Sequence, residues 1–212
     1  MGALRRVGVL IVLVVVALTA LSAAAGGTAR HKARVTFIGD SVAGSILENP
    51  TAARYLERYF DARFDLKVCR RLVMASCVYQ GVQPSTALEA VLARRGHLGQ
   101  TVVIDVGYND DSYGYKQGVN KMMRTLLSEG VKTVIWTTLY ENGSSSYHTV
   151  YIHNNRVIRQ AAKRWKQMRI ADWNAVCQGH SYFGSDGLHL NGPGAMALAH
   201  LFRQAIVKAH LH

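Results

Sequence analysis

Short apolar runs alternate with amphipathic stretches along most of this sequence. Runs rich in β-branched and other apolar residues occur at 35–39, 64–68, 101–107, 133–138 and 168–171. Near-continuous hydrophobicity over so few residues is typical of strands that are covered on both faces. Their alternation with helical stretches predicts an α/β domain, in which a five-stranded parallel sheet lies between two layers of helices.

Signals for helix starts support this alternation. Proline is favoured in the first turn of a helix, and Pro50 and Pro193 each precede apolar residues at helical spacing. Thr86 and Glu89 match a capping box, in which each side chain accepts the backbone N–H of the other residue. We expect helices over 50–60, 86–95, 119–129, 150–166 and 193–206. The residues of the first helix expected to face the core are Ala53, Leu56, Tyr59 and Phe60.

The first 25 residues have the pattern of a secretory signal peptide. Arg5 and Arg6 precede an apolar run over 7–21, and small residues follow at 22–27. We therefore expect a signal peptide over 1–25, a linker over 26–34 and a folded domain over 35–212. The alternative is an uncleaved anchor, although the apolar stretch is slightly shorter than the about 20 residues that span a bilayer. In either case the folded part is expected outside the cytoplasm, secreted or anchored through this segment.

The charge balance indicates which class of partner to expect. The chain carries 25 Lys and Arg residues against 13 Asp and Glu residues, a formal net charge of +12. This excess favours acidic partners, and a location outside the cytoplasm disfavours nucleic acid. An acidic surface polymer is therefore the charged partner we expect. A membrane is expected only if the N-terminal segment is retained.

Cys69, Cys77 and Cys177 are the cysteines of the chain. An exported protein can keep a disulfide, and Cys69 and Cys77 are near enough in sequence to close a small loop. The alternative is that all three are reduced and buried as small hydrophobic residues. No Cys or His spacing here is typical of a metal site, so we predict neither a metal nor a cofactor.

Polar segments occur where three loops of the predicted sheet are expected to meet. Gly39-Asp40-Ser41 ends the first strand, Gly107-Tyr108-Asn109-Asp110 follows the third strand, and Asp186-Gly187-Leu188-His189 precedes the last helix. Ligand sites of open parallel sheets lie at the carboxyl ends of the strands. We therefore expect these segments to converge on one edge of the sheet.

The residue types in these segments are those of nucleophilic catalysis. The hydroxyl of Ser41 is a weak nucleophile that needs a base, and His189 can accept and return a proton near neutral pH. Asp186 can orient the imidazole, and the Ser41 N–H and the Asn109 amide can stabilise an oxyanion. Taken singly, the Asp-x-x-His segment also fits simple helix capping, and Asn109 also fits a turn.

Together these segments resemble three signature blocks of the SGNH (GDSL-type) hydrolases, and the likeness extends over about 35–207. Finer features resemble the SGNH domains found with membrane sugar O-acyltransferases: Gly39-Asp40-Ser41-Val42, Val68-Cys69-Arg70-Arg71 and Asp172-Trp173. The resemblance implies a three-layer flavodoxin-like fold, a Ser41–His189–Asp186 triad and no metal. The family's second block supplies a glycine N–H to the oxyanion hole. In this sequence the residue that matches this glycine is Cys69 or, alternatively, Gly81.

The leading hypothesis is a secreted serine esterase that forms an acyl-enzyme. Its substrate would be a small acyl ester, with acetyl on a carbohydrate as the expected case, because no loop supplies the apolar groove that a long acyl chain needs. One alternative is an O-acyltransferase that passes the acyl group to a sugar hydroxyl. The other is a non-catalytic module that binds an acidic cell-wall polymer.

Overall fold

The computed structural model describes residues 31–211. The predicted signal peptide and most of the predicted linker therefore lie outside the described residues. The folded unit begins at Lys32. Within this described part, no helix has both the length and the apolar character needed to cross a membrane.

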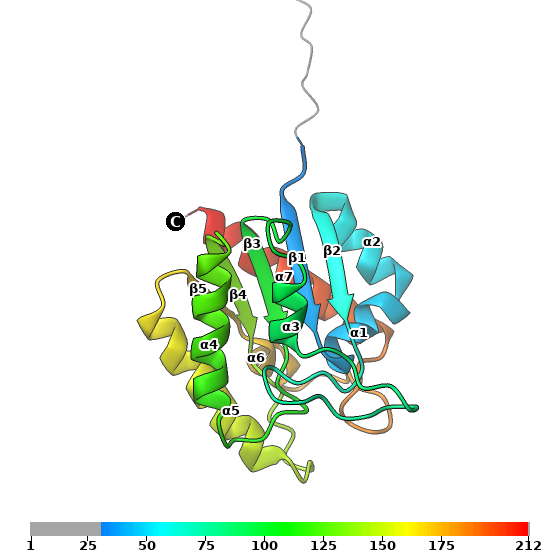
Figure 1. Cartoon of the computed structure of the whole chain (residues 1–212). Helices are drawn as coiled ribbons and strands as arrows, with labels where there is room; N and C mark the ends of the chain where they lie inside the picture. Colours follow the sequence, from blue (N-terminus) through cyan, green and yellow to red (C-terminus); the bar gives the residue numbers. More distant parts are fainter. Residues whose placement is uncertain (1–30, 212) are drawn as a thin grey trace, which may run out of the picture. The chain divides into compact units, whose positions relative to one another are not determined.

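Parallel strands form the central sheet (Figure 1). They are β1 (Arg34–Gly39), β2 (Asp61–Leu66), β3 (Thr101–Asp105), β4 (Thr133–Thr137) and β5 (Met168–Ala171). The order β2-β1-β3-β4-β5 places a topological switch point between β1 and β3. The predicted α/β fold with a five-stranded parallel sheet is confirmed.

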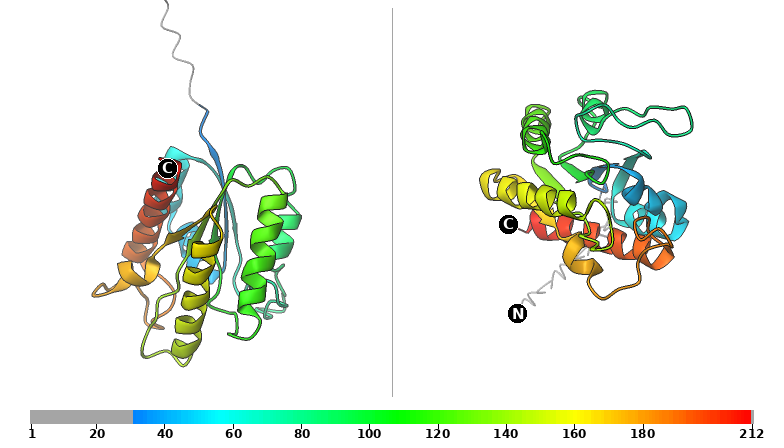
Figure 2. Two further views of the ribbon diagram at one scale, coloured as in Figure 1. Left: turned by 90° about the vertical axis from the view of Figure 1, so that its left-hand side faces the viewer. Right: turned by 90° about the horizontal axis from the view of Figure 1, so that it is seen from below.

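Helices cover both faces of this sheet, as the two views of Figure 2 show. On one face lie α1 (Ser41–Glu48), α2 (Pro50–Tyr59), α6 (Trp173–Cys177) and α7 (Gly192–His210), which share a core with Val35 and Phe37. On the other face lie α3 (Ala87–Leu92), α4 (Tyr115–Ser128) and α5 (His148–Arg164), which share a core with Ile38. Successive residues of β1 thus supply both cores, because side chains alternate along a strand.

The strand register brings the ends of the central strands level with one another. Gly39 pairs with Leu66 of β2 and with Asp105 of β3. A Cβ at Gly39 would overlap Ala43 and Leu66, so a glycine lets α1 begin directly above the sheet. The chain enters α1 at Ser41 and leaves β3 toward Asn109 at the same edge.

Some predicted details were wrong. The second strand begins at Asp61 rather than at Phe64. This strand lies at the edge of the sheet, where exposed polar residues such as Arg63 are tolerated. Its first residues therefore do not form the continuous apolar run from which a buried strand is predicted. The side chain of Tyr59, expected to face the core, is 38% exposed, and the Arg203 guanidinium lies over its ring at 4.1 Å.

Candidate active site

Asp40 connects the turn at the end of β1 to the loop after β3. Its Oδ1 accepts the Val42 N–H at 3.0 Å and thereby caps α1. Its Oδ2 accepts the N–H groups of Gly107 and Tyr108, each at 3.2 Å. The buried carboxylate thus fixes Ser41 relative to the loop that carries Asn109.

A second buried carboxyl group lies beside Asp40. Asp105 is 1% exposed, and neither of its carboxylate oxygens has a hydrogen-bond partner among the described residues. Burial, followed by the negative charge of Asp40, raises the pKa of Asp105 well above its usual value. Burial also raises the pKa of Asp40 to about 6, although its backbone hydrogen bonds oppose that shift. The negative charge of the Asp40–Asp105 pair therefore resides on Asp40, because Asp40 accepts hydrogen bonds from backbone N–H groups and Asp105 does not.

The side chains of Ser41, His189 and Asp186 form one hydrogen-bonded relay. Ser41 Oγ lies 3.0 Å from His189 Nε2, and His189 Nδ1 lies 2.6 Å from Asp186 Oδ2. Because a carboxylate can only accept, the proton of the imidazole sits on Nδ1, and Nε2 is left to accept the Ser41 hydroxyl. This is the order of contacts that a nucleophile, a base and an orienting acid require.

Asp186 is held in place by its own loop. Its Oδ1 accepts the backbone N–H groups of Leu188 at 2.9 Å and of His189 at 3.0 Å. The hydrogen bond from the His189 side chain, and then that from Leu188, lower the pKa of Asp186 to about 2. The loop is tied to α1, the helix that begins at Ser41, because Leu190 N–H donates to Ser45 Oγ at 3.2 Å.

Asn109 lies at the same edge of the sheet, in the loop after β3. Its Nδ2 donates one hydrogen bond to the Arg70 carbonyl at 3.2 Å. A primary amide has two N–H groups, and the second has no partner among residues 31–211, so it is available to a ligand. This geometry suits an oxyanion donor whose orientation is fixed before substrate binds.

The two alternatives for the second block lie in different parts of the structure. Cys69 directly precedes Arg70, whose carbonyl binds Asn109, and it forms a disulfide with Cys77. Gly81 lies instead in the exposed turn of the hairpin formed by Tyr79 and Val82. Gly81 therefore belongs to this exposed hairpin. Cys69, in contrast, is the residue directly before Arg70, to which Asn109 is hydrogen-bonded.

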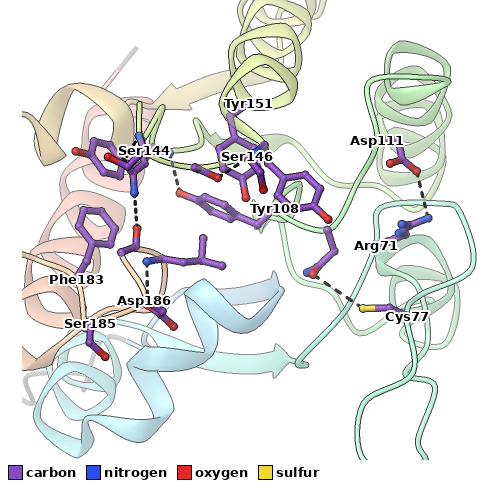
Figure 3. Close-up of a pocket in the computed structure, with 17 residues that line it drawn as sticks. Arg71, Cys77, Tyr108, Asp111, Ser144, Ser146, Tyr151, Phe183, Ser185 and Asp186 are labelled. Carbon is purple, nitrogen blue, oxygen red and sulfur yellow. Dashed lines mark hydrogen bonds and ion pairs between the residues drawn. The ribbon is translucent and has the colours of Figure 1, made fainter.

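A cavity of about 700 Å³ opens beside the triad. Figure 3 shows Arg71 and Cys77 on one side of it and Phe183 and Asp186 on the other. Its aromatic lining consists of Tyr108, Tyr140, Tyr147, Tyr151 and Phe183, and its polar lining includes Asn109, Asn142, Ser144, Ser145 and Ser146. Ser41 and His189 do not line it, so the cavity adjoins the hydrogen-bonded relay through Asn109 and Asp186.

The aromatic walls of the cavity are fixed by contacts between distant segments. The rings of Tyr140 and Phe183 stack with centroids 4.5 Å apart and planes at 12°. The Tyr108 hydroxyl accepts the Tyr140 N–H at 2.8 Å. Asn142 Nδ2 donates to the Gly187 carbonyl at 3.0 Å, which ties the loop after β4 to the loop of Asp186. The sequence did not predict Tyr140 and Phe183 as lining residues, and its signal for the aromatic lining was limited to the aromatic residues flanking the polar loop at 141–147.

Within residues 31–211, no cluster of His, Cys, Asp or Glu side chains could hold a metal ion. The titratable groups at the sheet edge include Asp186 and His189 of the relay. The relay can take a proton from an alcohol and return it to a leaving group, and the Asn109 amide can stabilise an anion nearby.

Known proteins resemble this chain in sequence and in fold. No protein-family model matches the chain. A candidate O-acetyltransferase of Staphylococcus aureus is 30% identical over 173 residues, which cover 81% of this chain and 24% of that protein. The chain therefore spans about a quarter of the length of this relative.

Solved structures share the whole fold. The C-terminal catalytic domain of Streptococcus pneumoniae peptidoglycan O-acetyltransferase A has a TM-score of 0.67 and 24% identity, over 85% of this chain and 96% of that domain. A member of the lipolytic G-D-S-L family from Veillonella parvula has a TM-score of 0.60 and 13% identity, over 82% of this chain and 98% of that protein. The chain has the SGNH-hydrolase fold. The predicted resemblance to the SGNH hydrolases is thereby confirmed at the level of the fold.

Proposed function

We propose that this SGNH-fold protein is a serine esterase that hydrolyses short O-acyl esters, acetyl in particular, on carbohydrate. The observation that carries the proposal is the relay from Asp186 through His189 to Ser41, with contacts of 2.6 and 3.0 Å. A serine hydroxyl within reach of an oriented imidazole base is the requirement for covalent acyl transfer.

The reaction follows from these contacts. Ser41 Oγ attacks the ester carbonyl while His189 Nε2 takes the hydroxyl proton, and the resulting imidazolium is stabilised by Asp186. The tetrahedral intermediate collapses when His189 gives the proton to the leaving sugar hydroxyl, which leaves an acyl group on Ser41. His189 then deprotonates a water molecule that attacks the acyl-enzyme, and it returns the proton to Ser41 Oγ as the second tetrahedral intermediate collapses and releases the carboxylic acid.

The oxyanion has donors from three segments. Ser41 is the first residue of α1, so its N–H has no acceptor within the helix. The free N–H of Asn109 is the second donor, and the N–H of Cys69 is the third. Fixed donors are effective here because they need no reorientation as charge develops on the carbonyl oxygen.

The cavity supports a short acyl group on a sugar. Both aromatic rings and hydroxyl groups line its walls, which suits the apolar faces and hydroxyl edges of a sugar ring. A long acyl chain would need a groove of aliphatic side chains, whereas the aliphatic lining here is limited to Leu188. The Staphylococcus aureus relative and the Streptococcus pneumoniae domain are both named for O-acetyl transfer.

We also propose that the protein acts outside the cytoplasm. The apolar pattern of residues 7–21 carries this proposal. The disulfide between Cys69 and Cys77 supports it, because disulfides persist mainly in oxidising compartments.

The proposed function is tested by replacing Ser41, the proposed nucleophile. Ser41→Ala should abolish hydrolysis of p-nitrophenyl acetate and labelling by a fluorophosphonate probe, while the thermal melting curve stays close to that of the wild type. A folded variant that keeps wild-type turnover would show that Ser41 is not the nucleophile. Wild-type protein that is neither labelled nor active, yet retains acidic polymer, would favour the non-catalytic binding module.

Acyl transfer to a sugar is the second candidate, favoured by the names of the two relatives. The same acyl-enzyme serves both reactions, and only a site that excludes water would favour transfer. The measurement is the ratio of acetylated sugar to free acetate when chitooligosaccharide is added to p-nitrophenyl acetate and enzyme. Acetylated sugar in excess of acetate would make the protein a transferase.

A further inference from the structure

Cys69 has a backbone conformation that is unusual for a residue with a side chain. Its φ is +66°, in the left-handed region that glycine occupies freely and other residues occupy rarely. The residue lies immediately before Arg70, whose carbonyl binds the Asn109 amide. The strained position therefore coincides with the place from which the third oxyanion donor would come.

The segment that follows Cys69 lies along the loop of Asn109. The Arg70 carbonyl accepts Asn109 Nδ2 at 3.2 Å, and the Leu72 N–H lies 3.0 Å from each carboxylate oxygen of Asp110. These bonds join 70–72 to 109–110. A displacement of the first segment would therefore move the Asn109 amide as well.

Arg70 fixes one end of this segment from inside the protein. Its guanidinium is fully buried and donates to the Asp65 carbonyl at 2.6 Å and to Asp65 Oδ1 at 2.9 Å. Its Nε donates to the Ser85 carbonyl at 2.9 Å. Arg70 is thus anchored on one side of Cys69, whose own backbone is in the left-handed region.

The disulfide also constrains Cys69. Cys69 and Cys77 are bonded through their sulfur atoms, with Cα atoms 5.2 Å apart, and the Cys77 N–H donates to the Cys69 carbonyl at 3.2 Å. The Cys77 sulfur also lies 4.0 Å from Asn109 Oδ1 and lines the cavity (Figure 3). The bond thus holds both the left-handed residue and one side of the Asn109 amide.

We propose that the Cys69–Cys77 disulfide is a redox-dependent positioning element of the oxyanion hole. It keeps Cys69 in the left-handed conformation and keeps the 70–72 segment against Asn109, so that the donors face the oxyanion. The proposal rests on the esterase function proposed above. It assigns the cysteines no contact with substrate, since they act through the Cys69 N–H and the Asn109 amide.

Reduction releases the constraint. A dithiol supplies two electrons and two protons, so that the S–S bond breaks, two protein thiols form and the dithiol becomes its own disulfide. Cys69 can then return to a conformation with negative φ, which turns its N–H away from the site. Both cysteines are only half-buried, so a small dithiol can reach them.

The first experiment compares oxidised protein with protein reduced by dithiothreitol. Hydrolysis of p-nitrophenyl acetate is measured per mole of Ser41 labelled to completion by fluorophosphonate, so that unfolded molecules are not counted. We expect kcat to fall at least about tenfold and KM to change by less than about twofold, because a displaced donor weakens transition-state binding selectively. A Cys69→Ala/Cys77→Ala variant treated with dithiothreitol is the control for any effect through Cys177.

The second experiment separates the backbone conformation from general loss of stability. Cys69→Gly/Cys77→Ala and Cys69→Ala/Cys77→Ala both lack the disulfide, but only glycine adopts the left-handed conformation without strain. We expect the glycine variant to recover most of the kcat lost by the alanine variant, although both melt at lower temperature than the wild type.

Each result decides the proposal. Equal kcat per labelled site before and after reduction would overturn it, as would a glycine variant no better than the alanine variant. Oxidised wild-type protein that neither hydrolyses the ester nor labels at Ser41 would instead overturn the esterase function itself, and this inference with it.

Discussion

Replacing Asn109 tests the oxyanion hole directly. In Asn109→Ala both N–H donors are lost, including the one that remains after the bond to the Arg70 carbonyl at 3.2 Å. Loss of one such donor lowers kcat by about 10²–10³, equivalent to roughly 2.7–4 kcal/mol of transition-state stabilisation. Because the contact strengthens only as charge develops on the carbonyl oxygen, KM should change little.

The same substitution also has a structural effect that must be separated from catalysis. The lost hydrogen bond to Arg70 should lower the free energy of unfolding by about 0.5–1.5 kcal/mol. Such a loss leaves nearly all molecules of an ordinary domain folded, so it cannot account for a hundredfold change in kcat. Asn109→Asp is the matched control, since it keeps the size of the side chain but provides acceptors where donors are needed.

The assay is steady-state hydrolysis of p-nitrophenyl acetate with kcat and KM determined separately, together with urea unfolding of each variant. A change confined to KM would make Asn109 a residue of substrate binding. An unchanged kcat in folded Asn109→Ala would refute the assignment of the amide to the oxyanion hole. Asn109→Asp with wild-type kcat would refute it equally, because that carboxylate would face the developing negative charge.

Three further predictions follow from the same geometry. Asp186→Asn should lower kcat by about 10³–10⁴ at unchanged KM, because the amide no longer selects the Nδ1–H tautomer of His189. Burial raises the pKa of Asp110 from 3.8 to about 7, so the folded protein keeps a proton that the unfolded chain releases near pH 4. Its contribution to the free energy of unfolding therefore falls as pH rises from about 4 to 7, and in urea unfolding Asp110→Asn should gain stability over the wild type between pH 5 and pH 8. Acetyl esters should be hydrolysed with higher kcat/KM than octanoyl esters, and an octanoyl preference in a p-nitrophenyl ester series would contradict the carbohydrate assignment.

Local sequence signals predicted much of the fold because each strand and most helices are defined by neighbouring residues. The apolar runs marked the strands of the sheet, and the capping box at Thr86 and Glu89 is present as expected. Helix α1 was not predicted. It begins at Ser41 itself, and its glycine and serine residues are more typical of a turn. Asp40 caps the helix by accepting the Val42 N–H.

The candidate site was predictable where function depends on short spacings and not where it depends on long-range contacts. Asp186 and His189 lie three residues apart, so one loop orients both. The stacking of Tyr140 on Phe183 joins residues that no spacing connects. For the same reason, the spacing of Cys69 and Cys77 indicated a loop that could close, but it could not reveal that the closed loop would lie against Asn109.

Asp40 explains why these separate elements can work as one site. In the sequence it is an ordinary turn residue, yet in the structure its side chain is fully buried and accepts N–H groups from α1 and from the loop after β3. A neutral side chain could cap the helix, but an amide oxygen would be a weaker acceptor for three donors than a carboxylate. The positive form of His189 and the charge of Asp40 also attract each other, which opposes the effect of burial on the pKa of Asp40. If His189 takes the proton from Ser41, as proposed, the imidazolium lies in the field of two carboxylates: Asp186 at its Nδ1 and Asp40, which directly precedes Ser41 in the chain.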